Sequence, residues 1–209
     1  MYTLENVIGA AVAAQRINGE YVKYSILSSD PKFNKESNLT IMHRLLRDES
    51  PISADAFEQG QNIISYCQGL LFKCIGGTIN DYSMAILKVI RSSEIDPQDK
   101  FSMSIAASIP SYYERESKKD KVESRLNSAK GVIAGSIGQK VIITVEIIKS
   151  VFSFKYNTTF VTAITTDNIP VFFGYKKSLP VSNTPIKIVG AIKAFRDGIT
   201  QLNYVKVIE

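Results

Sequence analysis

The spacing of apolar residues changes near residue 135, and this change divides the chain into two parts. Before it, apolar residues recur at intervals of three and four; after it, they recur at intervals of two. The first spacing places apolar side chains on one face of a helix, and the second places them on one face of a strand. The sequence therefore predicts an α+β fold, with a mainly helical N-terminal region over residues 1–135 and a β domain over residues 136–209.

Four segments of the first part carry helix signals. Ser53 is a capping residue followed by apolar residues at helical spacing, and this segment closes on Gly76 and Gly77. Asn80 or Asp81 caps the next helix. The predicted helices are residues 1–15, 53–77, 79–96 and, after Pro110, 111–131. Residues 18–33 fit either an extended hairpin-like element or a loop, and the pattern leaves both open.

The second part is typical of five strands. Residues 141–147 alternate between apolar and polar, residues 158–166 are mostly β-branched, and a turn at Asp167-Asn168 leads into residues 169–174. After a connector with Pro180, residues 185–209 supply two closing strands. Five strands in about 70 residues, with a long first strand and an irregular link before the fourth, predict a Greek-key barrel of the OB type. Residues 127–139 are expected to be the hinge between the two parts.

The positive charge of the chain lies in its last third. The formal net charge is +5, and residues 139–209 hold nine Lys and Arg against four Asp and Glu. Such a confined basic segment indicates contact with a polyanion, although a basic face kept for solubility explains the charge alone equally well.

An OB-fold binds oligonucleotides on its second and third strands, between the loop joining strands one and two and the loop joining strands four and five. Here those segments combine rings, on which bases stack, with cations, which neutralise phosphates. The predicted nucleic-acid-binding residues are Phe154, Lys155, Tyr156, Phe160, Phe173, Tyr175, Lys176, Lys177, Lys187, Lys193, Phe195 and Arg196.

Core packing is the alternative role of every strand aromatic in this set. Phe172 and Phe173 are adjacent and point to opposite faces, so at least one of them is buried. On the fourth strand, alternation places Lys187, Lys193 and Phe195 on one face, opposite the isoleucines.

The sequence offers little support for an enzyme, a metal site or a membrane protein. Cys67 and Cys74 are seven residues apart, about 10 Å along a helix, which is too far for a disulfide. With His43 as the single histidine, a zinc site has too few ligands. Phosphate-loop and metalloprotease motifs are absent, so no catalytic residue, metal or cofactor is predicted. No apolar run is long enough to span a membrane, and the N-terminus does not read as a signal peptide, so a cytoplasmic location is expected.

Three segments within residues 53–209 carry a family resemblance: QGLLFKCIGGTINDYSMAILKVI, SIAASIPSYYERE and the barrel pattern GSIGQK…F…YNTTF…NIPVFF…IVGAIKAFRDGITQLNYVKV. Together they resemble a group of bacteriophage single-stranded DNA-binding proteins that have a C-terminal OB-fold. The resemblance implies a role in phage DNA replication or recombination in the host cytoplasm. Such relatives often have a Trp where this chain has Val171-Phe172-Phe173, and a Gly where it has Asn157. This difference leaves open whether the third-strand aromatic stacks on bases or packs in the core.

The resulting prediction is a protein without enzymatic activity that binds single-stranded DNA with little sequence preference. The helical region is expected to mediate self-association or contact with a replication or recombination protein. Two alternatives remain: a protein-interaction, structural or inhibitory phage factor, and an RNA-binding accessory to transcription or translation.

Overall fold

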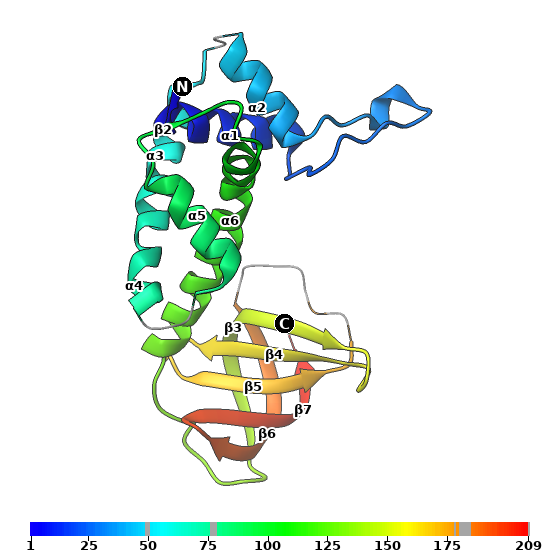
Figure 1. The fold of residues 1–209 in the computed structure, drawn as a ribbon. Helices are drawn as coiled ribbons and strands as arrows, with labels where there is room; N and C mark the ends of the chain where they lie inside the picture. The colour runs from blue at the N-terminus through cyan, green and yellow to red at the C-terminus, as the bar shows by residue number, and fades with distance from the viewer. Residues whose placement is uncertain (49–50, 76–78, 178, 180–184, 209) are drawn as a thin grey trace. The chain divides into compact units, whose positions relative to one another are not determined.

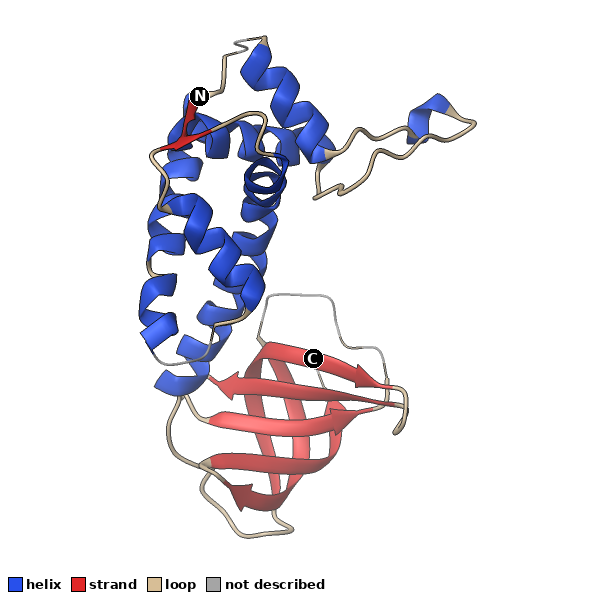
Figure 2. Cartoon of the chain, viewed as in Figure 1, coloured by secondary structure: helices blue, strands red, loops and turns tan. Residues whose placement is uncertain are grey.

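The computed structural model describes residues 1–48, 51–75, 79–177, 179 and 185–208 (Figure 1). These residues form two compact units, 1–117 and 118–209, and the division lies within one long helix, α6 (Lys100–Ser128). The first unit is helical and the second consists mainly of strands (Figure 2). The predicted α+β class is therefore confirmed.

Helix α1 (Leu4–Asn18) runs through the core of the first unit, where Val7, Ile8 and Ala11 are fully buried. It packs against α3 (Ala54–Gln68) at a point where Gly60 meets the backbone of Gly9, and a Cβ on Gly60 would lie only 3.2 Å from the Gly9 nitrogen. The remaining elements of this unit are β1 (Tyr2–Thr3), η1 (Pro31–Phe33), α2 (Asn38–Arg47), α3 (Ala54–Gln68), α4 (Leu70–Ile75), α5 (Asp81–Ile90) and β2 (Glu94–Ile95). Strands β1 and β2 pair in an antiparallel manner.

Two predicted helix starts are confirmed by capping hydrogen bonds. The Ser53 hydroxyl accepts from the Ala56 amide at 3.2 Å, and the Asn80 side chain accepts from the Ser83 amide at 2.9 Å. The helix expected over residues 53–77 is instead divided at Gly69 into α3 and α4. The expected stop at residues 76–77 lies outside the described residues.

The predicted helix start after Pro110 is wrong, because α6 begins at Lys100 and continues through this proline. The Asp99 carboxylate caps the helix by accepting from the Phe101 and Ser102 amides, each at 3.1 Å. A proline removes one backbone hydrogen bond from a helix. Burial of Met103 and Ile109 in the same helix offsets that loss.

The second unit is a closed barrel of five strands in the order β3-β4-β5-β7-β6. All neighbours are antiparallel except β5 and β7, which are parallel. The strands are β3 (Lys140–Ser153), β4 (Thr158–Thr165), β5 (Pro170–Tyr175), β6 (Ile186–Arg196) and β7 (Ile199–Val207). This order is that of the predicted OB type, so β4 and β5 are its second and third strands. The expected connector residue at position 180 lies outside the described residues.

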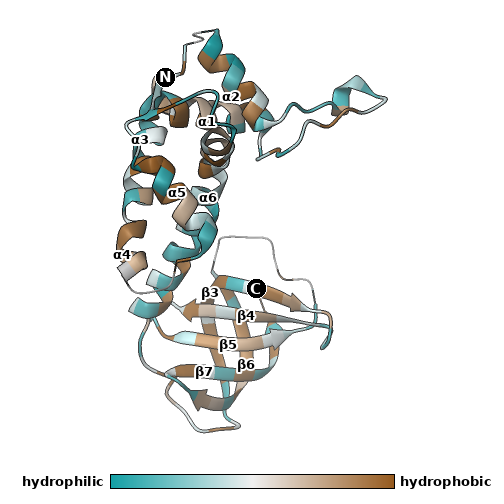
Figure 3. Ribbon diagram, in the orientation of Figure 1, coloured by the Kyte–Doolittle hydropathy of each residue, from teal (hydrophilic) through white to brown (hydrophobic). Residues whose placement is uncertain are grey.

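Hydrophobic and hydrophilic residues alternate along the barrel strands (Figure 3). The hydrophobic ones form the core of the barrel. The last turns of α6 are attached to this unit: Arg125 donates to both carboxylate oxygens of Glu146, at 2.6 and 2.7 Å. The Asn168 side chain donates to the Ser128 carbonyl at 3.0 Å. None of the helices in the described ranges is long and apolar enough to cross a membrane.

Candidate nucleic-acid interface

The pairing of β4 with β5 determines which aromatic side chains face outward. Val161 is opposite Phe173, and both are buried, at 0% and 1% exposure. Thr162 is opposite Phe172, one position along, so Phe172 lies on the outer face. The structure therefore corrects one predicted site residue: Phe173 belongs to the barrel core, and its neighbour Phe172 takes the surface position.

Three rings form a continuous row on the outer face, and we call Tyr156, Phe160 and Phe172 the ring row. The rings of Phe160 and Phe172 are nearly parallel, with an interplanar angle of 9° and centroids 5.8 Å apart. Tyr156 meets Phe160 edge to face at 5.9 Å. Gly174, the partner of Phe160 on β5, has no side chain to cover that ring. The row thus presents aromatic surface from the β3–β4 turn to the middle of the barrel wall.

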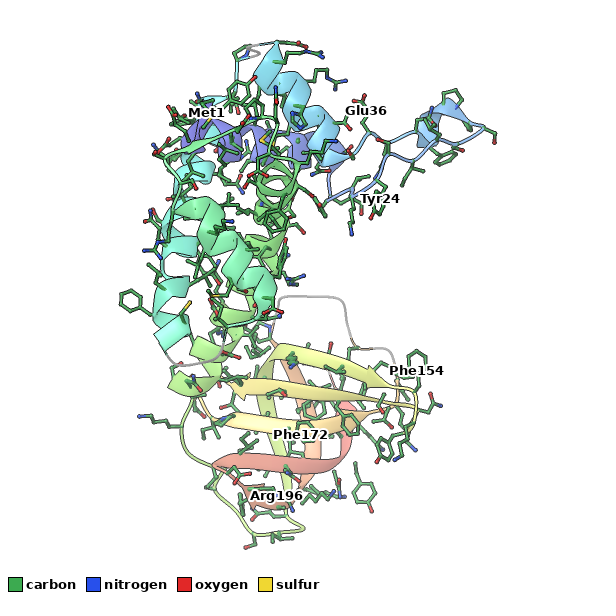
Figure 4. All side chains as sticks on the ribbon, in the orientation of Figure 1. Met1, Tyr24, Glu36, Phe154, Phe172 and Arg196 are labelled. Carbon is green, nitrogen blue, oxygen red and sulfur yellow. The ribbon has the colours of Figure 1, made fainter. Side chains whose placement is uncertain are left out.

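The β3–β4 turn carries the most exposed of the predicted aromatic residues, Phe154, which Figure 4 labels and which is 91% exposed. Lys155 is also exposed, and its Nζ lies 5.5 Å from the centroid of the Tyr156 ring. The turn requires Asn157 at a φ of +44°. Asparagine tolerates this left-handed conformation better than most residues, which accounts for Asn where the resembled proteins often have Gly.

Lys193 and Arg196 lie on the opposite side of the ring row from this turn. Ala194 pairs with Gln201, and Gln201 pairs with Phe172. A register shift just before Ala194 leaves Lys193 exposed beside that pair, about 10 Å from Phe172 at two strand spacings. Arg196 is exposed at the end of β6, and Figure 4 shows it on a different part of the barrel from Phe154.

The same register shift separates two residues that strand alternation had placed together. Phe195 pairs with Thr200, which is fully buried, so Phe195 projects from the rim of the barrel rather than from the outer face. It remains 40% exposed. The predicted common face of Lys193 and Phe195 is therefore wrong.

The remaining predicted cations gather at the end of the barrel where β5 and β7 finish and β6 begins. Lys176 and Lys177 follow β5 directly after Tyr175, and all three line a hollow of about 650 Å³. The Lys187 carbonyl accepts from the Ile208 amide at 2.9 Å, which places Lys187 at this end as well. The structure thus brings Tyr175 and these three lysines together, whereas Lys193 and Arg196 form a separate group.

Four residues of this region were missed by the prediction: Phe152, Phe172, Tyr204 and Lys206. Phe172 could have been found, because strict alternation around the core residues of β5 decides between it and Phe173. Tyr204 had only an indirect sequence signal, since Gly190, a glycine inside the neighbouring strand, marks the bulge at which Tyr204 lies.

Charge is divided unequally between the two units. Residues 118–209 contain fourteen Lys and Arg against six Asp and Glu, a net charge of +8. Residues 1–117 contain eleven against fourteen, a net charge of −3. Glu146, one of the six acids, is already paired with Arg125, and the hydrogen bond from Arg125 lowers the pKa of its carboxyl. The unit that contains the ring row therefore carries the net positive charge of the chain.

Within the described residues, no cluster of three or more His, Cys, Asp or Glu side chains is arranged to hold a metal ion. Comparisons with protein-family models, with curated proteins and with solved structures find no match to this chain. The geometry shows a closed five-strand barrel, consistent with an OB-like fold, with an aromatic row on its second and third strands and cations on both sides of that row.

Proposed function

We propose that residues 118–209 bind single-stranded DNA without strong sequence preference, and that the protein serves DNA replication or recombination. The observation that carries this proposal is the outward ring row on β4 and β5, within a unit of net charge +8. The resemblance to phage single-stranded DNA-binding proteins supports the assignment to DNA, to a phage and to the host cytoplasm.

The ring row suits unpaired bases because each base has two flat faces and stacks on an aromatic side chain whatever its identity. Each such stack contributes about 1–3 kcal/mol, and one OB-fold covers about 4–16 nucleotides. Phosphates between the bases are neutralised by lysines, which makes the affinity fall as salt rises. In duplex DNA the bases are stacked on one another, so the ring row favours a single strand.

Replacing one ring of the row tests the proposal. We expect Phe172→Ala to weaken binding of fluorescent oligo-dT about 5- to 150-fold, as measured by anisotropy titration, because one base loses its stacking partner. The matched control is Ile142→Ala, which removes a 62% exposed side chain from β3. Ile142 lies in the part of β3 that pairs with β6, away from the ring row. This control should bind as the wild type does. Unchanged affinity of a folded Phe172→Ala variant would reject the ring row as the binding surface.

Two further measurements separate the alternative functions. An RNA-binding accessory would prefer oligo-U over oligo-dT in a competition titration. A protein-interaction or structural factor would show no affinity for oligo-dT even at about 50 mM salt, where phosphate contacts are strongest.

We assign protein contact to the helical unit, either with a second copy or with a replication or recombination protein. Its loop between α1 and α2 carries Tyr24, Leu27 and Phe33 at 71%, 89% and 67% exposure (Figure 4). Large apolar side chains grouped on one surface segment are typical of interaction sites. Sedimentation of the wild type against Leu27→Ser and Phe33→Ser tests self-association, which predicts a lower mass for both variants.

A further inference from the structure

The hollow at the ends of β5 and β7 has a composition suited to an anionic ligand. Two tyrosines and three lysines line it, namely Tyr175, Tyr204, Lys176, Lys177 and Lys206, together with Gly174 and two valines. None of the described residues that line it is acidic. Its volume of about 650 Å³ is within the range of small-molecule sites, so it has room for a nucleotide.

Among the described residues, no neighbouring side chain neutralises the lysines of this hollow. Lys176, Lys177 and Lys206 are exposed, and none forms an ion pair with a described residue. Lys187 adds a fourth charge, because Val189 pairs with Lys206 and alternation puts Lys187 and Val189 on the same side of β6. Grouped like charges repel one another, so a bound anion would stabilise this arrangement.

Tyr204 is an independent indication of a ligand, because its backbone is strained. It has a φ of +53°, in the left-handed region. The other non-glycine residues with positive φ are Asn157, Asn168 and Asp197, which lie in turns and belong to the types that tolerate this region. Tyr204 is instead a bulky residue on a strand, and its side chain is 86% exposed.

The fold explains why the backbone at position 204 has a positive φ, but it does not explain why the residue there is a tyrosine. β7 has an extra residue here opposite Gly190, and this bulge allows both Leu202 and Val205 to point into the barrel. Glycine or asparagine would serve this bulge with less strain. Residues held in unfavourable backbone conformations are concentrated at functional sites. The strain at Tyr204 therefore indicates a role for its exposed ring outside the barrel.

We propose that this hollow is a second contact for the bound single strand, in which Tyr204 stacks on a base and Lys176, Lys177 and Lys206 neutralise its phosphates. The inference rests on the proposed function and extends the binding surface beyond the ring row. The two surfaces adjoin, because Gly174 lines the hollow and pairs with Phe160. From Phe172 to Lys177 is about 17 Å along an extended chain, so one oligonucleotide can reach both.

The test is Tyr204→Asn, since asparagine accepts the same backbone conformation and removes the ring. We expect this variant to unfold at an equal or higher denaturant concentration than the wild type, and to bind oligo-dT of about 16 nucleotides at least about fivefold more weakly. Lys206→Gln should flatten the dependence of log affinity on log salt by about 0.7. The matched control is Phe101→Ala, which removes a 57% exposed ring from the first turn of α6 in the helical unit and should leave binding unchanged.

An oligonucleotide with 5-iodouracil gives a direct readout, because photocrosslinking should attach it to Tyr204 and mass spectrometry should locate the adduct. If Tyr204→Asn and a Lys176→Gln/Lys177→Gln/Lys206→Gln variant bind as the wild type does, while Phe172→Ala binds weakly, the second contact is refuted and the proposed function stands. If the wild type binds no oligo-dT at any length or salt concentration, both proposals fail together.

Discussion

Phe172 and Phe173 show how adjacent residues of one type take different roles in a strand. Phe173 is fully enclosed in the barrel, whereas Phe172 lies on the outer wall against Phe160. We expect Phe173→Ala to lower the free energy of unfolding by about 3–5 kcal/mol, because it leaves a large cavity in a packed core. Phe172→Ala should cost clearly less, because the ring is only half-buried and its removal leaves no enclosed cavity; the lost aromatic pair accounts for about 0.5–1.5 kcal/mol of the cost. Urea denaturation of both variants measures the difference, and equal losses would contradict the assigned faces.

Cys67 provides a prediction about reactivity. The side chain is fully buried in the helical unit, and this burial raises the pKa of its thiol to about 12. The thiol should therefore stay protonated and resist Ellman's reagent at pH 8 in the folded protein, while the partly exposed Cys74 reacts. After denaturation both should react. Equal rates for the two thiols in the folded protein would show that the helical core opens readily.

The same thiol links stability to high pH. An unfolded cysteine ionises near its ordinary value of about 8.5, whereas folded Cys67 does not ionise until about pH 12. The contribution of the Cys67 thiol to the free energy of unfolding is fully present below the pKa of the unfolded thiol. It is lost as pH rises from that value toward 12. We expect Cys67→Ser to reduce the fall in unfolding free energy between pH 8 and about pH 10.5, and urea titrations at the two pH values measure this.

At the scale of elements, sequence reasoning succeeded where one local signal decides the structure. Ser53 and Asn80 cap helices as predicted, and alternation over residues 141–147 identifies the core side of β3. It failed at Pro110, which was taken as a boundary although tertiary packing holds it inside α6. The sequence predicted which strands and turns form the candidate site, but not which of their side chains point outward. The register shifts in β6 and β7 reverse which side chains point outward. Gly190 marks the first shift, whereas no glycine or turn residue marks the shift between Ile192 and Ala194.

The ion pair between α6 and β3 is a surface contact, and we expect it to contribute little to the free energy of unfolding. Arg125 and Glu146 have side chains that are 49% and 36% exposed, so solvent screens their attraction. Glu146→Gln should lower the unfolding free energy by about 1 kcal/mol or less. The control is Glu123→Gln, an exposed carboxylate on the same helix that should have no effect.

This contribution should also depend on pH with a definite sign. The hydrogen bond from Arg125 lowers the pKa of Glu146 below its usual value of 4.5. The stabilisation is therefore present above about pH 4.5 and is lost as pH falls through the lowered pKa. Urea titrations should show that the wild type and Glu146→Gln differ at pH 7 and converge near pH 2. A difference that persists in acid would mean that the charge pair is not its source.

At the scale of the whole molecule, the two units have charges of −3 and +8, and each has its own hydrophobic core. We expect a fragment of residues 118–209 to fold alone and to bind oligo-dT with the salt dependence of the full chain. A fragment of residues 1–117 should not bind it. Circular dichroism and anisotropy titrations check both. A folded barrel fragment without affinity would assign the binding surface to the helical unit.

The position of β7 between β5 and β6 has a consequence for biosynthesis. Along the chain β7 follows β6, so the ribosome has produced the other four barrel strands before β7 emerges. Only β7 can then pair with both β5 and β6 and close the barrel. Until then both strands carry unpaired backbone amides and carbonyls along one edge, which are templates for association with other chains. Premature termination before residue 199 would therefore yield an open sheet with unpaired edges, which aggregates, rather than a smaller closed barrel.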